Sequence, residues 1–400
     1  MISLQSMKFL LFFLTVWGSG HAYIAHRLIR PLPTGSRWRP VGWVWLAVSL
    51  LIAPLVIVGR WLSLDQALFD ILAWIAYVDM GFFLVLVPLL VVRDTGWILF
   101  RSLRTLHHKL AGRQHPITPA STARRQFLAN TMNAGMLGLT GGMTVAGYFE
   151  ARRLARVKEI SIPIRGLPRD LQDFHIVQLS DIHIGPTIKG DYLLGIVERC
   201  NELHPDMVAI TGDLIDGLTN QLQEDVAPLA QLRSRHGSYF VTGNHEYYWD
   251  ANSWTALLET LGVKVLLNEN QVIRHGNARL MVAGVTDYAG DKYVPDHLSD
   301  PQQARRHAPR TDASILLAHQ PRSAFAGEAA GYDLQLSGHV HGGQFLPWNL
   351  FIKLVQPFSN GLHRLNNRMW LYVSAGTGYW GPPQRLGVAP EITSIRLRRA

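Results

Sequence analysis

Polar side chains suited to metal binding follow several short hydrophobic runs in the second half of this 400-residue chain. The run 173–180 leads into Asp181 and His183, and the run 206–211 leads into Asp213. Carboxylate, amide and imidazole groups are ligands that first-row transition metals accept. The spacing therefore predicts a metal site assembled from distant parts of the sequence. The other runs lead into Asn244 and His245 (after 238–242), His319 (after 313–318), and His339 and His341 (after 333–336).

Each of these motifs is weak by itself, because a lone Asp-x-His or Gly-Asp is common in turns. The pair His339-x-His341 is more informative, since alternate residues of an extended segment project to the same side. Cys200 is the only cysteine, so neither an intrachain disulfide nor a thiolate metal site can form. The many imidazoles favour Mn²⁺, Fe or Zn²⁺ over Mg²⁺ or Ca²⁺. We interpret the whole set as one site for divalent transition metal ions.

The elements that must position these residues alternate between strands and helices. This alternation predicts an α/β fold whose functional residues lie at the carboxyl ends of strands. Glycines beside the motifs, such as Gly243 and Gly338, mark places where the backbone must approach a metal or phosphate closely. Besides the five runs above, the pattern predicts strands near 264–267, 278–284, 369–374 and 391–397, and helices at 190–203, 221–233, 251–262 and 322–331.

The ordered set Asp-x-His, Gly-Asp, Gly-Asn-His-Glu, a lone His and Gly-His-Val-His resembles the calcineurin-like metallophosphoesterase family. The resemblance covers roughly residues 173–376 and misses no ligand position. It implies a metallophosphoesterase-type β-sandwich flanked by helices and holding two metal ions. It also implies roles: Asp181, His183 and His341 would bind the first ion, Asn244, His319 and His339 would bind the second, Asp213 would bridge both, and His245 would hydrogen-bond or protonate the phosphate oxygens.

The resemblance implies a metal-dependent phosphoesterase, a hydrolase acting on phosphate esters or pyrophosphates. Two ions about 3.5–4 Å apart can clamp phosphate oxygens and lower the pKa of a bridging water. The resulting hydroxide attacks phosphorus in line with the leaving oxygen, so no protein nucleophile is needed. A nuclease or cyclic-nucleotide phosphodiesterase is an alternative, because the same metal core serves both. No basic and aromatic stripe in 173–376 favours nucleic acid. A non-catalytic membrane scaffold or sensor is a second alternative, which the complete ligand set opposes.

The first 150 residues differ from the rest because they carry long apolar runs. A helix needs about 20 mostly apolar residues to cross a bilayer. The sequence therefore predicts a transmembrane region of about four helices at 1–150, followed by a catalytic domain at 151–400. Asp79 interrupts the third apolar run, and a carboxylate inside a membrane can mark a functional site. The four runs are 7–25, 40–59, 66–92 and 126–149.

Basic residues predict how this region is oriented. The net charge is +9, and the loops 26–39 and 93–125 are rich in arginine, whereas the loop between them has Arg60 as its one cation. The positive-inside rule places both arginine-rich loops in the cytoplasm. Residues 150–400 would then lie outside the cytoplasmic (inner) membrane. Four basic residues within 152–158 oppose this prediction.

The segment before the fourth apolar run resembles an internal twin-arginine export signal. It reads Ser121-Thr-Ala-Arg-Arg-Gln-Phe-Leu128 and precedes a mildly hydrophobic, glycine-rich stretch. The alternative is that Arg124 and Arg125 simply flank a helix. No convincing cleavage motif follows, so we expect the segment to remain as an anchor.

Several residues outside the main motifs have weaker signals. Asp216 and Glu246 are expected behind the ligands or in solvent, and Asp287 and His363 either line the cleft or lie on the surface. The stretch 343–363 is unusually apolar for a loop and could approach the bilayer. Together with the anchor, it favours a phosphorylated small molecule or an envelope or lipid-linked compound as substrate. The aromatic residues that could form an apolar wall, or fill the core, are Trp348, Tyr379 and Trp380.

Overall fold

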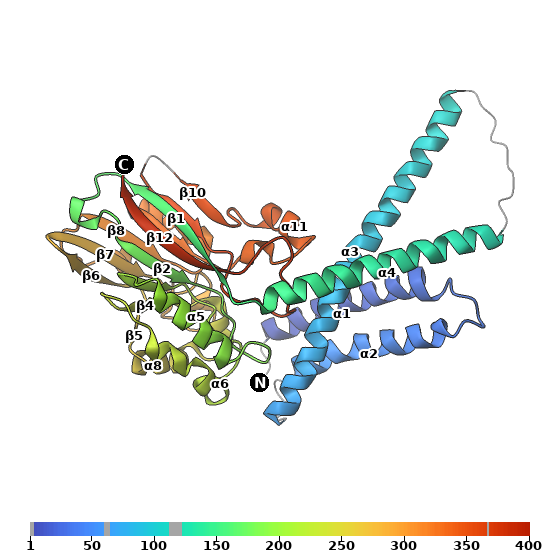
Figure 1. The fold of residues 1–400 in the computed structure, drawn as a ribbon, viewed down its shortest axis with the longest axis horizontal. Helices are drawn as coiled ribbons and strands as arrows, with labels where there is room; N and C mark the ends of the chain where they lie inside the picture. The colour runs from blue at the N-terminus through green and yellow to red at the C-terminus, as the bar shows by residue number, and fades with distance from the viewer. Residues whose placement is uncertain (1–3, 60–64, 112–121, 366–367) are drawn as a thin grey trace. The chain divides into compact units, whose positions relative to one another are not determined.

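The computed structural model describes residues 4–59, 65–111, 122–365 and 368–400 (Figure 1). The chain divides into two compact units, residues 1–146 and 147–400. Arg60 and Arg113, which served to predict the orientation, and Ser121, which begins the predicted export motif, lie outside the described residues.

The first unit is helical. Its elements are α1 (Leu4–Ile24), the short π-helix η1 (Ala25–Ile29), α2 (Trp38–Gly59), α3 (Gln66–Leu110) and the larger part of α4 (Thr122–Arg152). In the described part of the chain, α2 and α3 are long and apolar enough to cross a membrane. The prediction of about four transmembrane helices is confirmed in part: four helices are present, but in the described residues only α2 and α3 are clear candidates to span a membrane, and the run 7–25 in α1 is not one of them. Gly, Ser and His in the second half of α1, and Gly, Asn and Thr along α4, lower the hydropathy of those two helices.

Helix α3 extends well past the predicted end at residue 92. The segment up to Leu110, expected as part of a loop, is rich in leucine and arginine, which favour helix. Asp79 of α3 accepts a hydrogen bond from Ser49 of α2 (2.5 Å), and the same hydroxyl lies 2.9 Å from His21 Nε2 of α1. These polar contacts connect three helices, so a structural role suffices to explain the Asp79 carboxylate.

The second unit contains two six-stranded mixed sheets. In the first sheet β2 to β5 run parallel, whereas β12 is antiparallel to β2 and parallel to β1. The register pairs Leu179 with Ile210 and Ile210 with Phe240, so three neighbouring strands end at one edge. In the order β1-β12-β2-β3-β4-β5, the strands are Arg156–Ile164, Glu391–Arg399, His175–Leu179, Met207–Ile210, Ser238–Phe240 and Val263–Val265.

The second sheet has four parallel strands, β11, β9, β8 and β7, with antiparallel β10 and β6 at its edges. Its register pairs Leu317 with Leu336, so β8 and β9 also end together. In the order β10-β11-β9-β8-β7-β6, the strands are Gly361–Arg364, Trp370–Val373, Leu334–Ser337, Ala313–Leu317, Ala278–Gly284 and Glu269–His275.

The two sheets pack face to face, with helices on both outer faces. Ile176 and Met207 of the first sheet share one buried core with Val282 and Leu336 of the second. The other face of the first sheet packs against α5 (Gly190–Glu202), α6 (Thr219–Val226) and α8 (Ala251–Thr260). The other face of the second sheet packs against α9 (Pro301–Arg305) and α10 (Ala324–Ala329). The predicted α/β fold with flanking helices is confirmed.

All nine predicted strands are present, at slightly different bounds. The three strands that were not predicted, β1, β6 and β10, lie at sheet edges, where polar residues are common and the hydrophobic pattern is weak. The expectation of a loop across 343–363 is wrong, because α11 (Trp348–Val355) lies within it. The remaining short helices are η2 (Arg169–Leu171), η3 (Ala227–Gln231), α7 (Asn244–Tyr248), η4 (Gly290–Lys292), η5 (Pro321–Ser323) and η6 (His341–Gly343).

Candidate metal centre

Five of the predicted ligands have backbone in the left-handed region, which non-glycine residues rarely adopt. Each such conformation costs on the order of 1–3 kcal/mol, and they cluster at functional sites. Hydrogen bonds between strand ends hold them: Asp181 N donates to Gly212 O (3.0 Å), and His183 N donates to Asp213 O (3.2 Å). The φ angles are 54° at Asp181, 55° at His183, 51° at Asp213, 72° at His339 and 51° at His341.

Asp181, His183 and His341 form a first group of donors, whose ligand atoms lie within 4.8 Å of one another. His183 Nε2 is 3.1 Å from His341 Nε2, which is 3.5 Å from Asp181 Oδ1. All three side chains are buried. Two imidazoles and one carboxylate at these separations can share one transition metal ion.

Asp213, His319 and His339 form a second group. His319 Nε2 is 3.0 Å from Asp213 Oδ2 and 3.2 Å from His339 Nδ1. Asn244 begins α7, and its Nδ2 donates to the Tyr248 hydroxyl (3.3 Å), while its Oδ1 is buried without a hydrogen-bond donor. A buried oxygen of this kind is costly unless a cation binds it. The free amide oxygen therefore fits the role of a neutral metal ligand.

Asp213 lies between the two groups. Its Oδ2 is 4.0 Å from Nε2 of both His183 and His245, and its Oδ1 accepts the backbone N–H of His245 (2.9 Å). Burial alone would raise the pKa of this carboxyl, but the nearby charges of His319 and His245 outweigh burial and hold the pKa well below its ordinary value. An ionised carboxylate approached from both groups is suited to bridge two cations.

Burial and neighbouring charges shift the pKa values of the remaining ligands in both directions. Burial raises the pKa of Asp181, and the Asp213 carboxylate adds to this effect. Burial lowers the pKa of His339 to about 3, which leaves a neutral imidazole able to bind metal. Although burial opposes it, the Asp213 carboxylate raises the pKa of His319 well above its ordinary value. The shifts of Asp213 and His339 favour an ionised carboxylate and a neutral imidazole, the forms that bind metal.

Asp216 orients two of the imidazoles from behind. Its Oδ2 lies 3.2 Å from His183 Nδ1, and its Oδ1 lies 2.5 Å from His245 Nδ1. Burial lowers the pKa of His245, but Asp216 and Asp213 outweigh burial and raise it to about 9. Asp216 hydrogen-bonds Nδ1 of His245 and makes an ion-pair contact with Nδ1 of His183, and Nε2 of each ring is on the side of Asp213.

The other ligands are also oriented by contacts behind them. His319 Nδ1 is 2.8 Å from the Thr211 carbonyl oxygen, to which it can donate, so its Nε2 is free to bind metal. The buried Glu246 carboxylate accepts hydrogen bonds from the backbone N–H groups of Gly243, Asp213 and Leu214 at 2.6, 3.0 and 2.8 Å. Glu246 therefore ties the ends of β3 and β4 together and is not a solvent residue.

Arg385 is a supporting residue that the sequence did not reveal. Its fully buried guanidinium donates to the carbonyl oxygens of His341 (3.1 Å) and Ala375 (2.8 Å), and its Nη2 lies 3.1 Å from His341 Nδ1. Burial lowers the pKa of Arg385 to about 10. Burial and this guanidinium together hold the pKa of His341 well below its ordinary value. Arg385 fixes the His341 loop. Because Arg385 is remote from His341 in sequence, no local sequence motif predicts this contact.

Two glycines are required by close approach of the backbone to the ligands. A Cβ atom at Gly338 would lie 2.1 Å from Asp181 Oδ2, and one at Gly243 would lie 2.2 Å from Asp213 Oδ1. Neither distance is sterically possible, so both positions require glycine for the carboxylates to keep their places.

The residues with weaker sequence signals lie in different environments. Trp380 is 51% exposed, and its ring lies 5.7 Å from that of His245. Tyr379 is instead a core residue, whose hydroxyl donates to Thr187 O (3.1 Å). Asp287 is buried and accepts a hydrogen bond from Gln320 Nε2 (3.1 Å), while His363 Nε2 is 3.0 Å from Asn360 O.

Tyr248, which the sequence did not single out, has its ring 5.0 Å from that of His245. Trp380 and Tyr248 thus flank His245, whereas Tyr379 is part of the core.

The amino-acid sequence of this chain is similar to those of known proteins. Residues 174–343 match the calcineurin-like phosphoesterase family. The chain is 38% identical over 269 residues to a "Transmembrane protein with metallophosphoesterase domain" of Danio rerio, and 40% identical over 272 residues to the Bos taurus protein of the same name. These alignments cover 66% of this chain in both cases, and 62% and 61% of the relatives, so the chain spans less than two thirds of their length. An "Uncharacterized metallophosphoesterase" of Helicobacter pylori is 36% identical over 69% of this chain and 72% of its own.

Proposed function

The chain belongs to the calcineurin-like metallophosphoesterase family of metal-dependent phosphoesterases, and we propose that its second unit hydrolyses a phosphate ester or pyrophosphate with two divalent transition metal ions, Mn, Fe or Zn. The observation that carries this proposal is the position of Asp213, whose Oδ2 is 3.0 Å from one ligand group at His319 and 4.0 Å from the other at His183. Mixed imidazole and carboxylate donors suit these metals.

The proposed ligands divide as the two groups of donors do. One ion would be held by Asp181, His183 and His341, and the other by Asn244, His319 and His339, with Asp213 shared. When bound, the ions lower the pKa of a shared water and neutralise charge on the phosphate oxygens. The residues behind the ligands keep the donors in place, which is the main protein contribution to phosphoryl transfer. These residues are Asp216, Glu246 and Arg385.

We propose His245 as the proton donor. With a pKa raised to about 9 by Asp216 and Asp213 against burial, its imidazole carries a proton at neutral pH. Asp216 holds Nδ1, so Nε2–H is the group free to donate to a phosphate oxygen or to the leaving oxygen. Trp380 and Tyr248 flank this imidazole and limit its access to bulk water.

For the whole chain we propose a multi-pass anchor in the cytoplasmic membrane, with the catalytic unit outside it and an envelope or lipid-linked compound as substrate. The apolar helices α2 and α3 support the anchor, as does the similarity to relatives named transmembrane proteins. The arginine-rich loops support the orientation.

The test is hydrolysis by the purified full-length chain in detergent, loaded in turn with Mn²⁺, Fe²⁺ and Zn²⁺. A monoester, a diester and a lipid pyrophosphate would be assayed, and bound metal would be counted by elemental analysis. We expect two metal ions per chain and a loss of roughly 10³-fold in turnover for Asp213→Asn. Asp206→Asn, just before the opposite end of β3, is the matched control. A chain that holds two ions yet cleaves none of the substrates would overturn the proposal.

A further inference from the structure

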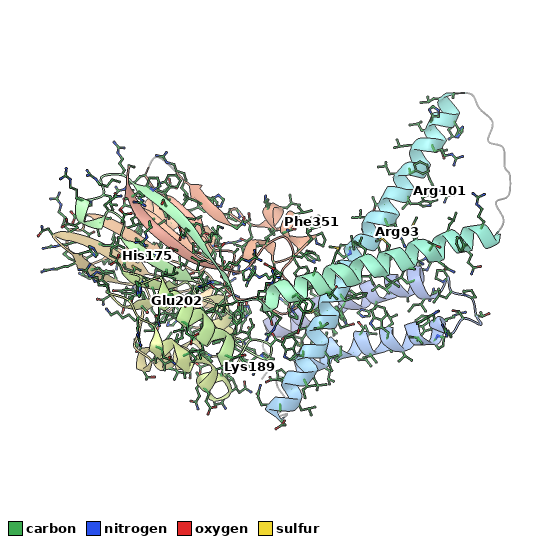
Figure 2. The ribbon with its side chains drawn as sticks, in the orientation of Figure 1. Arg93, Arg101, His175, Lys189, Glu202 and Phe351 are labelled. Atoms are coloured by element: carbon green, nitrogen blue, oxygen red, sulfur yellow. The ribbon has the colours of Figure 1, made fainter. Side chains whose placement is uncertain are left out.

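The short helix α11 presents its apolar side to the solvent. A helix on the surface of a soluble protein normally turns its apolar stripe towards the core. In α11 the core side is provided by Ile352, which packs on the second sheet's outer cluster, and by Asn349, which lies against Gly343. Phe351, labelled in Figure 2, is one of the five exposed apolar residues. Their exposed fractions are 40% for Trp348, 64% for Leu350, 49% for Phe351, 81% for Leu354 and 69% for Val355.

The five exposed residues lie on one continuous arc of the helix. At 100° per residue, positions 350, 354, 351, 355 and 348 follow one another around about 160° of the helix circumference. Scattered exposed apolar residues are normal on protein surfaces, but a contiguous patch of large side chains marks an interaction site.

The sequence on either side of α11 is one-sided in charge, although Arg385 is buried and Arg368 is paired with Asp333. The sequence from residue 334 to residue 390 contains no aspartate or glutamate, whereas it contains Lys353, Arg364, Arg368 and Arg385. Lys353 is exposed and lies next to the apolar arc. An exposed apolar face with a cation such as Lys353 at its border is typical of helices that lie in the head-group region of a bilayer.

Within the second unit, hydrogen bonds link the base of α11 to the first residue of that unit, Gly147. Gly147, in the last turns of α4, accepts a hydrogen bond from Arg385 N (2.9 Å). The neighbouring Leu386 carbonyl accepts a hydrogen bond from Leu346 N (3.1 Å), two residues before α11 begins. The helices that can cross a membrane, α2 and α3, precede α4 in the same chain.

We propose that α11 is an interfacial helix that inserts its apolar face into the surface of the lipid bilayer. This is an interaction with lipid and goes beyond hydrolysis of a phosphate ester. His341 begins η6, and α11 starts seven residues after it. Docking of α11 would therefore bring the loop that carries a proposed metal ligand close to the lipid head groups.

The test uses the full-length chain and a fluorophore that responds to its surroundings. The single native cysteine, Cys200, is buried, and burial raises the pKa of its thiol to about 12, so it resists labelling. Leu354→Cys would carry the label on α11, and Leu298→Cys, 61% exposed and outside 334–390, would be the matched control. Both labelled chains would be placed in nanodiscs of zwitterionic and anionic lipids, with and without spin-labelled acyl chains, and also in lipid-free amphipol.

We expect a blue-shifted emission at Leu354→Cys in nanodiscs that spin-labelled lipid quenches at least twofold, and neither effect at Leu298→Cys. Two other outcomes would overturn the proposal. Quenching of Leu354→Cys by aqueous iodide in nanodiscs would show that the face stays in water. Shielding from iodide in both nanodiscs and amphipol, without quenching by lipid, would show that protein covers the face, either another segment of this chain or a second copy. None of these outcomes depends on catalysis.

Discussion

Histidine and aspartate side chains gather at both ends of the parallel strands in the second unit. The carboxyl ends carry the candidate metal centre. At the opposite ends, Asp206 precedes β3, His236 precedes β4, and His275 ends the antiparallel β6, and their donor atoms also lie within 4.8 Å of one another. His236 Nε2 is 3.1 Å from His275 Nδ1, the same separation as His183 Nε2 to His341 Nε2. Distances between donors alone would not tell the two ends apart.

The surroundings of the donors do distinguish them. In the candidate metal centre the second nitrogen of His183 lies 3.2 Å from the Asp216 carboxylate, and that of His319 is 2.8 Å from the Thr211 carbonyl oxygen. At the opposite end Asp206 is already engaged by the backbone N–H of His175 (2.8 Å) and lies 4.0 Å from His275. The two ends therefore differ in the groups that orient the donors and fix their protonation, which metal binding requires in addition to proximity.

His245 gives the largest expected effect within this comparison. Its pKa is raised to about 9, whereas burial and the nearby His275 lower the pKa of His236. His245→Gln should therefore reduce kcat by roughly 10²–10³-fold at neutral pH, because it removes a proton donor. In the parent, kcat should fall as pH rises through the His245 pKa and the donor loses its proton, and this alkaline limb should be absent in the variant. The measurement is a pH profile of kcat with bound metal counted at each pH. Retention of the alkaline limb in His245→Gln would refute the role.

Asp216 and Asp206 form a matched pair for testing the oriented end against the opposite end. Asp216→Asn should weaken the hold on His183 and His245 and cost about 10–100-fold in activity or metal affinity. Asp206→Asn alters an aspartate that is also beside histidines, and we expect activity within about twofold of the parent, since such substitutions away from a site have small effects. Metal titrations and kcat/KM would be compared for both variants. Equal losses of activity and metal affinity in the two variants would show that the contacts of Asp216 with the imidazoles do not contribute specifically to the site.

The histidines at the opposite end should be dispensable for metal binding. The double variant His236→Gln/His275→Gln should bind two ions per chain, as we expect of the parent, because these two imidazoles contact each other (3.1 Å) and Asp206 is 4.0 Å from His275. Elemental analysis would count the ions, with Asp213→Asn as the control that must lose metal. A third ion that binds to the parent and not to the double variant would show that the histidines at the opposite end also bind metal. The proposed difference between the two ends of the strands would then be wrong.

The ligand types and the strands that carry them could be predicted, because each follows a buried hydrophobic run. The eight predicted residues come from five strand ends, and the register of the two sheets brings those ends to one edge. Asp216 and Glu246 were expected near the ligands or in solvent, and their buried contacts depend on loops whose geometry no motif specifies.

Arg385 and α11 could not be predicted for different physical reasons. Arg385 contacts the His341 loop mainly through carbonyl oxygens, so its partners leave no side-chain pattern in the sequence. The α11 segment reads as an apolar loop because Pro347 and Pro357 flank it, and its exposed face reverses the usual inward orientation of an apolar stripe. Edge strands such as β6 were missed because their residues alternate weakly.

The smallest expected effect concerns the stability of the opposite end. His175, labelled in Figure 2, is buried at the start of β2, with Nε2 2.8 Å from Ser394 Oγ. Burial, with Arg396 adding to it, lowers the pKa of His175, so the folded chain keeps the ring neutral while the unfolded chain binds a proton below pH of about 6.5. The stability that this ring contributes is present above that pH and is lost as pH falls towards the folded-state pKa.

His175→Gln keeps a hydrogen-bonding group near Ser394 but removes this titration. The difference in thermal unfolding midpoint between pH 7.5 and pH 5.5 should therefore be smaller in His175→Gln than in the parent. His307→Gln, which changes an exposed histidine of the same unit, should leave the difference unchanged. Metal loss at low pH affects all three chains, so the comparison among them isolates the buried ring. An unaltered pH dependence of the unfolding midpoint in His175→Gln would mean that His175 does not contribute to the acid sensitivity of the second unit. The acid sensitivity would then have to come from other groups, such as those of the candidate metal centre.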